Sequence, residues 1–144
     1  MYTKGQLEGI MLSLARPEIT VFKSNVNGVK YCCRIRVVLR STNLEFLAAI
    51  QRSLHQHMIK SILKEKENKQ RVSPILIVGN RLSIKRLLMI VPAYVPNSYG
   101  DWAFLNQMLT AMEENKHLDE DGILEMKEWY DANKEKRKAD IDSR

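Results

Sequence analysis

Cysteine, proline and glycine are scarce in this sequence, and long apolar runs are absent from it. Its 144 residues include two cysteines, four prolines and six glycines, which excludes disulfide-rich, collagen-like and low-complexity proteins. No stretch approaches the roughly 18 consecutive apolar residues of a membrane-spanning helix, so we expect no membrane partner. Hydrophobic residues make up 44% of the chain, which is enough to build the core of one ordinary domain.

The few cysteines also argue against a metal site. Cys32 and Cys33 are neighbours, and adjacent residues of a strand point to opposite faces, so we expect them neither to pair nor to share a metal ion. A zinc site would need more cysteines or well-spaced histidines. The first six residues hold no apolar run of the kind found in secretory signals. We therefore expect an intracellular chain, cytoplasmic or organellar and not secreted, with no cofactor.

Acidic residues are scarce in the first two-thirds of the chain. Residues 1–100 hold 16 Lys or Arg, five Glu and no Asp, a balance of +11, whereas residues 101–144 hold seven basic and twelve acidic residues, a balance of −5. This segregation favours a polyanionic partner for the first part, with nucleic acid the leading candidate. A merely solvated basic surface is the alternative, and charge alone does not separate DNA from RNA or from membrane headgroups.

A strongly apolar helix is expected over residues 6–14. Apolar residues surround most of its circumference, which is typical of a helix buried in a core or between subunits. Gly9 and Ser13 are four positions apart and share one face of this helix. Small side chains at that spacing let a second backbone approach closely. Pro17 ends the helix, and residues 18–24 have the composition of a strand.

A turn at residues 25–28 and a second strand at 30–41 complete a hairpin. In the second strand apolar residues alternate with arginines, so one face is core and the other carries Arg34, Arg36 and Arg40. Exposed strands often carry one or two basic residues that discourage edge pairing. Three arginines exceed that need, and the guanidinium fork suits phosphates and base edges. The pattern predicts that these side chains contact nucleic acid.

A second basic segment precedes a buried strand at residues 74–79. It spans residues 60–71, is interrupted by only two Glu, and forms a predicted second hairpin with that strand. A solvated hairpin tip is the alternative interpretation. The candidate nucleic-acid contacts in the segment are Lys60, Lys64, Lys66, Lys69 and Arg71.

Four more helices are predicted, at residues 43–58, 83–91, 102–114 and 118–134. We expect Thr42 to cap the first and Ser83 to cap the second, and Met58 to lie on the inner face of the first. Residues 136–144 form a charged tail that is expected to fray, so the sequence predicts a single domain over residues 1–135. The methionines expected to fill the core are Met11, Met89, Met108, Met112 and Met126.

The order of these elements and two of its segments resemble the LAGLIDADG homing endonucleases. Residues 7–21 resemble the family's motif helix entering its first strand, and residues 102–126 resemble its C-terminal helices. The resemblance implies an α+β fold, αββαββα, in which a curved four-stranded antiparallel sheet is the DNA-binding saddle and extra helices follow. One motif per chain implies a homodimer on double-stranded DNA, with Gly9, Leu12 and Ser13 at the dimer interface.

The chain departs from the family at the catalytic position. The family's metal-binding acid ends the motif helix, where this chain has Leu14, and a leucine holds no cation. Glu18 is the nearby carboxylate, with a metal-binding role as the weaker interpretation beside that of an exposed solubilising residue. We therefore expect duplex DNA binding without cleavage and no catalytic residue. Two alternatives remain: an active Mg²⁺-dependent endonuclease, and an RNA-binding, maturase-like protein that assists intron splicing.

Overall fold

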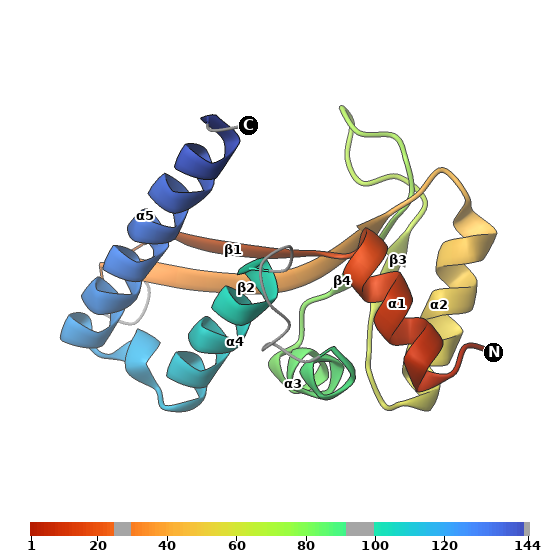
Figure 1. The fold of residues 1–144 in the computed structure, drawn as a ribbon, viewed down its shortest axis with the longest axis horizontal. Coiled ribbons are helices and arrows are strands. Elements are labelled where there is room, and N and C mark those ends of the chain that lie inside the picture. The colour runs from red at the N-terminus through yellow and green to blue at the C-terminus, as the bar shows by residue number, and fades with distance from the viewer. Residues whose placement is uncertain (25–29, 92–99, 143–144) are drawn as a thin grey trace. The chain divides into compact units, whose positions relative to one another are not determined.

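The computed structural model describes residues 1–24, 30–91 and 100–142, and the turn expected at 25–28 lies outside them. Figure 1 shows the helices and strands in these ranges. The helices are α1 (Lys4–Leu14), α2 (Leu44–Gln56), α3 (Arg81–Ile90), α4 (Gly100–Glu113), the 3₁₀ helix η2 (Lys116–Leu118) and α5 (Glu120–Asp142). The strands are β1 (Arg16–Lys23), β2 (Tyr31–Arg40), β3 (Ile62–Lys64) and β4 (Ile75–Val78).

The strands form one four-stranded antiparallel sheet in the order β1-β2-β4-β3. Along the β2–β4 pair, Val37 lies opposite Val78 and Arg40 lies opposite Ile75. On the other side of β4, Lys64 of β3 also lies opposite Ile75. The element order and the sheet confirm the predicted α+β fold, αββαββα with additional C-terminal helices. No helix in the described part of the chain is long and apolar enough to cross a lipid bilayer.

The chain divides into two compact units, which are described separately. Unit 1 comprises Met1–Glu18 and Arg36–Ala103, and unit 2 comprises Ile19–Ile35 and Phe104–Arg144. The single domain expected over residues 1–135 stays a prediction.

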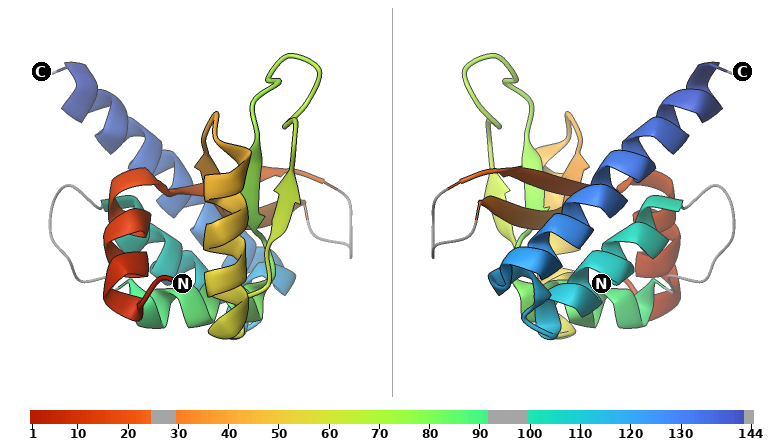
Figure 2. Two further views of the ribbon diagram at one scale, coloured as in Figure 1. Left: turned by 90° about the vertical axis from the view of Figure 1, so that its right-hand side faces the viewer. Right: turned by 90° about the vertical axis from the view of Figure 1, so that its left-hand side faces the viewer.

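Unit 1 buries one face of its strands against helices. Val37, Leu39, Leu76 and Val78 share that face through their cross-strand pairing, and all four are buried. In this unit α1 and α2 lie on one side of β3 and β4, while the connection between these two strands extends away from α3 (Figure 2). Each fully buried aliphatic side chain contributes roughly 1.5–3 kcal/mol to folding. The helical side chains of this core include Leu7, Met11, Leu47, Ile50, Leu54, Ile84 and Leu87.

Unit 2 is built mainly on α4 and α5. Phe104, Leu105, Met108, Leu109 and Met112 are all buried on α4, which confirms the core positions predicted for Met108 and Met112. The turn through η2 is fixed by close contacts of Lys116. Its ammonium lies 3.0 Å from the Glu125 carboxylate and 4.8 Å from the centre of the Trp129 ring.

The β2 segment of unit 2 holds the two cysteines, which are free thiols. Burial raises the pKa of the Cys33 thiol to about 12, with a further contribution from the neighbouring Cys32. Cys33 therefore stays protonated at neutral pH and is a poor nucleophile or metal ligand in the folded chain.

Both predicted helix caps are wrong by one to three residues. Asn43, not Thr42, caps α2 by accepting a hydrogen bond from the Phe46 backbone N–H at 3.1 Å. Asn80, not Ser83, caps α3 in the same way. In each case an asparagine oxygen reaches the backbone N–H three residues later, which satisfies a donor of the first helical turn. Ser83 lies inside α3, is buried, and accepts a hydrogen bond from the Lys60 N–H at 2.9 Å.

Two methionines expected in the core are exposed. Met58 has a positive φ of 62° just after α2, which turns its side chain outward to 65% exposure, and the next residue, Ile59, is buried instead. Met89 is 83% exposed, because the buried face of α3 is formed by Ile84, Leu87 and Ile90. The last helix is also longer than predicted and continues to Asp142.

Candidate nucleic-acid interface

The second half of β2 places Arg36 and Arg40 on the face of unit 1 opposite the helical core. Both alternate with the buried Val37 and Leu39, and both are half-buried. The predicted alternation therefore holds in this part of the strand. Val38 lies on the same face as the two arginines but is only 1% exposed, so neighbouring side chains cover it.

Glu18 of β1 bridges the two arginines. Arg36 Nε donates to Glu18 Oε1 at 2.8 Å, and Arg40 Nη2 donates to Glu18 Oε2 at 3.2 Å. The Glu18 side chain is half-buried and binds two guanidiniums, whereas the sequence favours an exposed, solubilising residue at this position. Each of its carboxylate oxygens accepts a hydrogen bond from a different guanidinium, which fixes the spacing between the two arginines.

Glu67 binds Arg40 from the connection between β3 and β4. Arg40 Nε donates to Glu67 Oε1 at 2.7 Å and Nη2 donates to Oε2 at 3.1 Å, a two-point, charge-assisted contact. The Glu67 side chain is 13% exposed and also lies 3.8 Å from the Arg71 guanidinium. The hydrogen bond from Arg40 lowers the pKa of Glu67, and Glu67 in turn raises the pKa of Arg40.

The sheet register adds a basic and an apolar row to this face. Lys64, Ile75 and Arg40 lie in one cross-strand row, and Ile62, Ile77 and Val38 lie in the next. Lys64 is exposed, and Ile62 is 60% exposed. Basic side chains beside apolar ones suit a DNA groove, where phosphates and base edges accept hydrogen bonds and thymine offers a methyl group. We call this surface, formed by Glu18, Arg36, Arg40, Ile62, Lys64 and Glu67, the outer sheet face.

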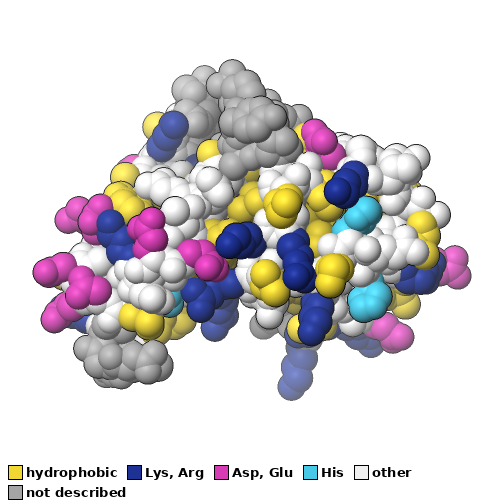
Figure 3. All heavy atoms as spheres, turned by 90° about the horizontal axis from the view of Figure 1, so that it is seen from below, with side chains coloured by type: hydrophobic (Ala, Val, Ile, Leu, Met, Phe, Trp, Pro, Cys, Tyr) yellow, Lys and Arg dark blue, Asp and Glu magenta, His cyan; other side chains and the backbone are white. Residues whose placement is uncertain are grey.

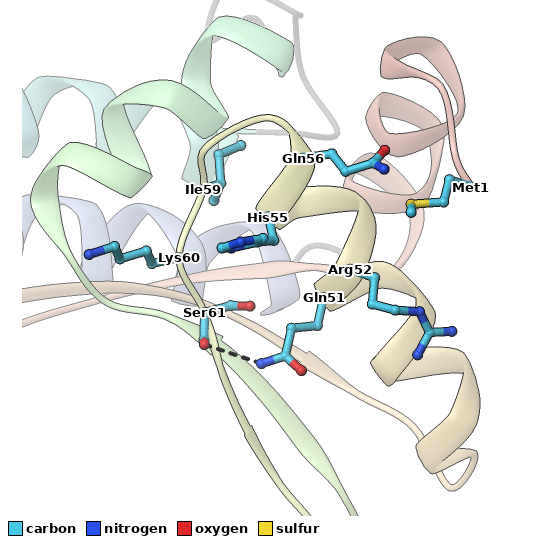
Figure 4. A pocket seen from close by; sticks show the side chains of 8 residues that line it. All are labelled: Met1, Gln51, Arg52, His55, Gln56, Ile59, Lys60 and Ser61. Carbon is cyan, nitrogen blue, oxygen red and sulfur yellow. Dashed lines mark hydrogen bonds between the residues drawn. The ribbon is translucent and has the colours of Figure 1, made fainter.

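The remaining basic residues of the second hairpin divide between two places. Lys66, Lys69 and Arg71 are exposed on the β3–β4 connection. Lys60 instead lines a groove of about 460 Å³ together with Arg52 and His55 of α2. Figure 4 shows these side chains around the groove, with Gln51 hydrogen-bonded to the Ser61 carbonyl oxygen.

Arg34 lies in unit 2, on the first half of β2. It is exposed, and its guanidinium stands 5.5 Å from the centre of the Phe22 ring. A cation over an aromatic face keeps its charge available while its orientation is restrained.

Basic side chains are not confined to the outer sheet face. Figure 3 shows Lys and Arg side chains next to hydrophobic ones on the face seen from below. In unit 1 the exposed positions of α3 include Leu82, Lys85 and Met89. Positive charge alone therefore does not identify a nucleic-acid surface in this molecule.

One side of α1 is open in the single chain. Gly9 and Ser13 are exposed and Leu12 is half-buried. A Cβ atom built on Gly9 would have no neighbour within 4 Å. Leu14, the last residue of the helix, is 47% exposed.

Comparison with known proteins identifies the architecture. No protein-family model matches the sequence, and no curated protein matches it significantly. Among solved structures, the homing endonuclease I-TnaI has a TM-score of 0.71 at 12% identity, over 86% of this chain and 82% of its own. The chain has the LAGLIDADG homing-endonuclease fold, which it shares with I-TnaI and with the LAGLIDADG homing endonuclease I-SmaMI. The archaeal intron-encoded I-Vdi141I, complexed with DNA, has a TM-score of 0.68 at 14% identity, over 83% of this chain and 74% of its own.

A longer protein shares the LAGLIDADG fold. The homing endonuclease I-SmaMI, bound to cleaved DNA, has a TM-score of 0.72 at 14% identity over 87% of this chain. Only 41% of the I-SmaMI chain is covered, so the present chain spans less than half of that protein's length.

The donor atoms at the end of α1 do not fit a divalent cation. The last residue of α1 is Leu14, whose side chain has no donor atom. Glu18 is the nearby carboxylate, but two guanidiniums hold its oxygens and would repel a cation. Within the described ranges, no three His, Cys, Asp or Glu side chains come together as a metal site.

Sequence reasoning missed the role of Glu67. In the sequence this residue only interrupts a basic run, whereas in the structure it is the partner of Arg40 across 27 positions. The available signal was a carboxylate within a lysine-rich connection next to a strand that displays arginines. An unpaired guanidinium row repels such a connection, so an acid inside it is a candidate counterion.

Proposed function

We propose that the chain binds double-stranded DNA in a sequence-preferring manner as a homodimer, without cleaving it. The observation that supports DNA binding best is the outer sheet face, where Arg36, Arg40 and Lys64 lie together on a LAGLIDADG fold. I-Vdi141I has that fold and is complexed with DNA. A DNA partner places this activity inside the cell or an organelle.

The homodimer is proposed from the open side of α1. Gly9 and Ser13 leave room for a second backbone, and Leu12 and Leu14 would gain burial beside it. Two copies related by a two-fold axis would present two outer sheet faces to a near-palindromic site.

Loss of cleavage is proposed from Leu14 and from the arginine contacts of Glu18. Phosphodiester hydrolysis with a metal ion needs carboxylate ligands at the scissile phosphate. The chain has an apolar side chain at the end of α1 and a carboxylate that is already held by Arg36 and Arg40. We propose no catalytic residue and no cofactor.

The test is selection of a binding site from random duplex DNA, followed by a cleavage assay. The enriched duplex should bind more tightly than a scrambled duplex, and neither Mg²⁺ nor Mn²⁺ should produce nicks. Structured RNA, added as competitor, should displace the duplex only at large excess. Nicking that is abolished in Glu18→Gln would show an active endonuclease, and preferential binding of the RNA would show a maturase-like protein.

A further inference from the structure

The connection between β3 and β4 has a defined conformation of its own. The Glu67 N–H donates to the Ser73 carbonyl oxygen at 3.1 Å, and the Asn68 N–H donates to that of Arg71 at 3.0 Å. The Asn68 side chain accepts from the N–H groups of Gln70 and Arg71 at 2.9 and 2.7 Å. These bonds make residues 67–73 a compact turn that displays Lys69 and Arg71.

This basic turn stands next to a row of arginines, which is electrostatically unfavourable without a counterion. Three guanidiniums, those of Arg36, Arg40 and Arg71, share the two carboxylates of Glu18 and Glu67. Without Glu67, Arg36 and Arg40 would share Glu18, and Arg71 would lose its carboxylate partner among these contacts. Like charges would then push the connection away from β2.

Glu67 also restricts how Arg40 can be used. Its two-point contact occupies Nε and Nη2 of Arg40 and leaves Nη1 as the guanidinium nitrogen without a partner among these contacts. A guanidinium held in this way presents its remaining donors in one direction. It therefore discriminates between acceptors better than a freely rotating one, while its shared charge attracts phosphates less.

We propose that Glu67 is a positioning residue that sets sequence discrimination in DNA binding, by fixing Arg40 and the basic turn at residues 67–73 against β2. This inference rests on the proposed function and names the residue that tunes it. Glu67 lowers affinity for arbitrary duplex DNA, because it removes positive charge from the outer sheet face. It raises the preference for the selected site, because it holds the arginines and the turn in register with the bases.

Glu65 provides a matched control on the same connection. It is exposed and has the same charge, so Glu65→Gln changes net charge as Glu67→Gln does without touching Arg40. The measured quantity is the ratio of dissociation constants for a scrambled duplex and the selected duplex of equal length. Glu65→Gln should strengthen the binding of both duplexes equally. Glu67→Gln should strengthen the binding of the scrambled duplex more than that of the selected duplex, which lowers the ratio by about tenfold.

A second measurement does not depend on DNA. Limited trypsin digestion, followed by mass spectrometry, reports cleavage after Lys69 and Arg71. Glu67→Gln should accelerate both cleavages, while its melting temperature falls by only a few degrees relative to Glu65→Gln, because only the turn is released. Equal cleavage in the two variants would show that Glu67 does not hold the turn and would overturn the inference.

The outcomes separate the inference from the function on which it rests. If the wild type discriminates between the duplexes but the two variants have the same ratio of dissociation constants, the role of Glu67 is overturned and the proposed function still stands. A wild type that binds no duplex overturns the proposed function, and the discriminating role of Glu67 with it.

Discussion

Glu18 and Arg36 form a two-contact ion pair across eighteen positions of sequence: Arg36 Nε and Nη2 lie 2.8 and 2.7 Å from Glu18 Oε1. Both side chains keep about a third of their surface exposed, 34% for Arg36 and 31% for Glu18. An ion pair this exposed adds little to stability, on the order of 0–1 kcal/mol. Its main consequence is the orientation of the arginine.

Replacing Arg36 should therefore affect site preference more than overall affinity. Arg36→Ala removes a fixed fork, and one base-edge contact is worth roughly 1–3 kcal/mol of discrimination. Lys69→Ala is the control, because an exposed turn lysine contributes to phosphate attraction at any sequence. The measurement is binding to the selected duplex and to its single-base variants. Equal effects of the two substitutions on every duplex would argue against a base contact by Arg36.

DNA affinity should depend steeply on salt. If a dimer neutralises about 6–10 phosphates, affinity falls by roughly 10³–10⁵ between 50 and 200 mM salt. Lys69→Ala should make the slope shallower by about one neutralised phosphate per chain. Fluorescence anisotropy at graded salt measures this slope. A flat response would exclude the basic side chains of unit 1 as the binding surface.

The open side of α1 gives a sharp test of the dimer. Alanine fits at both Gly5 and Gly9 in the single chain, since a Cβ there meets nothing within 4 Å. As a better helix former, alanine should add about 0.5–1 kcal/mol at each position. In a dimer packed at Gly9, however, Gly9→Ala should weaken association, while Gly5→Ala should only stabilise. Light scattering and melting over a dilution series distinguish these cases, and identical behaviour of the two variants would place the interface elsewhere.

Gly122 should not tolerate a side chain. A Cβ atom at this position would overlap the carbonyl oxygen of Lys116, which is backbone and cannot move aside cheaply. The Gly122 N–H also donates to the Asp119 carboxylate at 3.0 Å, at the start of α5. We expect Gly122→Ala to cost roughly 1–3 kcal/mol of the free energy of unfolding. Chemical denaturation measures this, with Gly5→Ala as the control that does not lose stability.

The contribution of Glu67 to stability should be lost in acid. The hydrogen bond from Arg40, together with the positive charges of Arg40, Arg71 and Arg36, lowers the pKa of Glu67 in the folded chain from the ordinary value of 4.5. Its stabilising effect is thus fully present above pH 4.5 and is lost as the pH falls through the lower folded value. The free energy of unfolding of the wild type should exceed that of Glu67→Gln by about 1 kcal/mol at pH 7. This difference, measured by chemical denaturation, should shrink below pH 4.5. If the difference in the free energy of unfolding does not change with pH, the charge of Glu67 does not stabilise the folded chain.

Strand periodicity predicted the outer sheet face only in part. Alternation along β2 located Arg36 and Arg40 correctly, because side-chain direction in a strand is a local property. It gave no indication that Val38, on the arginine side, is buried. That burial depends on side chains brought in from other segments of the chain.

Helix ends and ion pairs were the least predictable features. Serine and threonine are common caps, which favours Thr42 and Ser83, but Asn43 and Asn80 take that place. Which residue caps a helix depends on where the helix begins. Several neighbouring polar residues can each take the cap position, so the sequence alone does not determine the helix start. The contacts of Arg40 with Glu18 and Glu67 span 22 and 27 positions, and no local pattern encodes such distances.

The outermost strand on one side of the sheet is β3, which has only three residues and ends in Lys64. A strand this short offers few unpaired backbone groups to another molecule, and a lysine at its end opposes close approach. On a longer edge strand, an exposed apolar side chain such as that of Ile62 would favour pairing with a strand of a neighbouring chain. Unit 1 can therefore display an apolar side chain for contact with a partner and still resist fibril growth from that edge at high concentration.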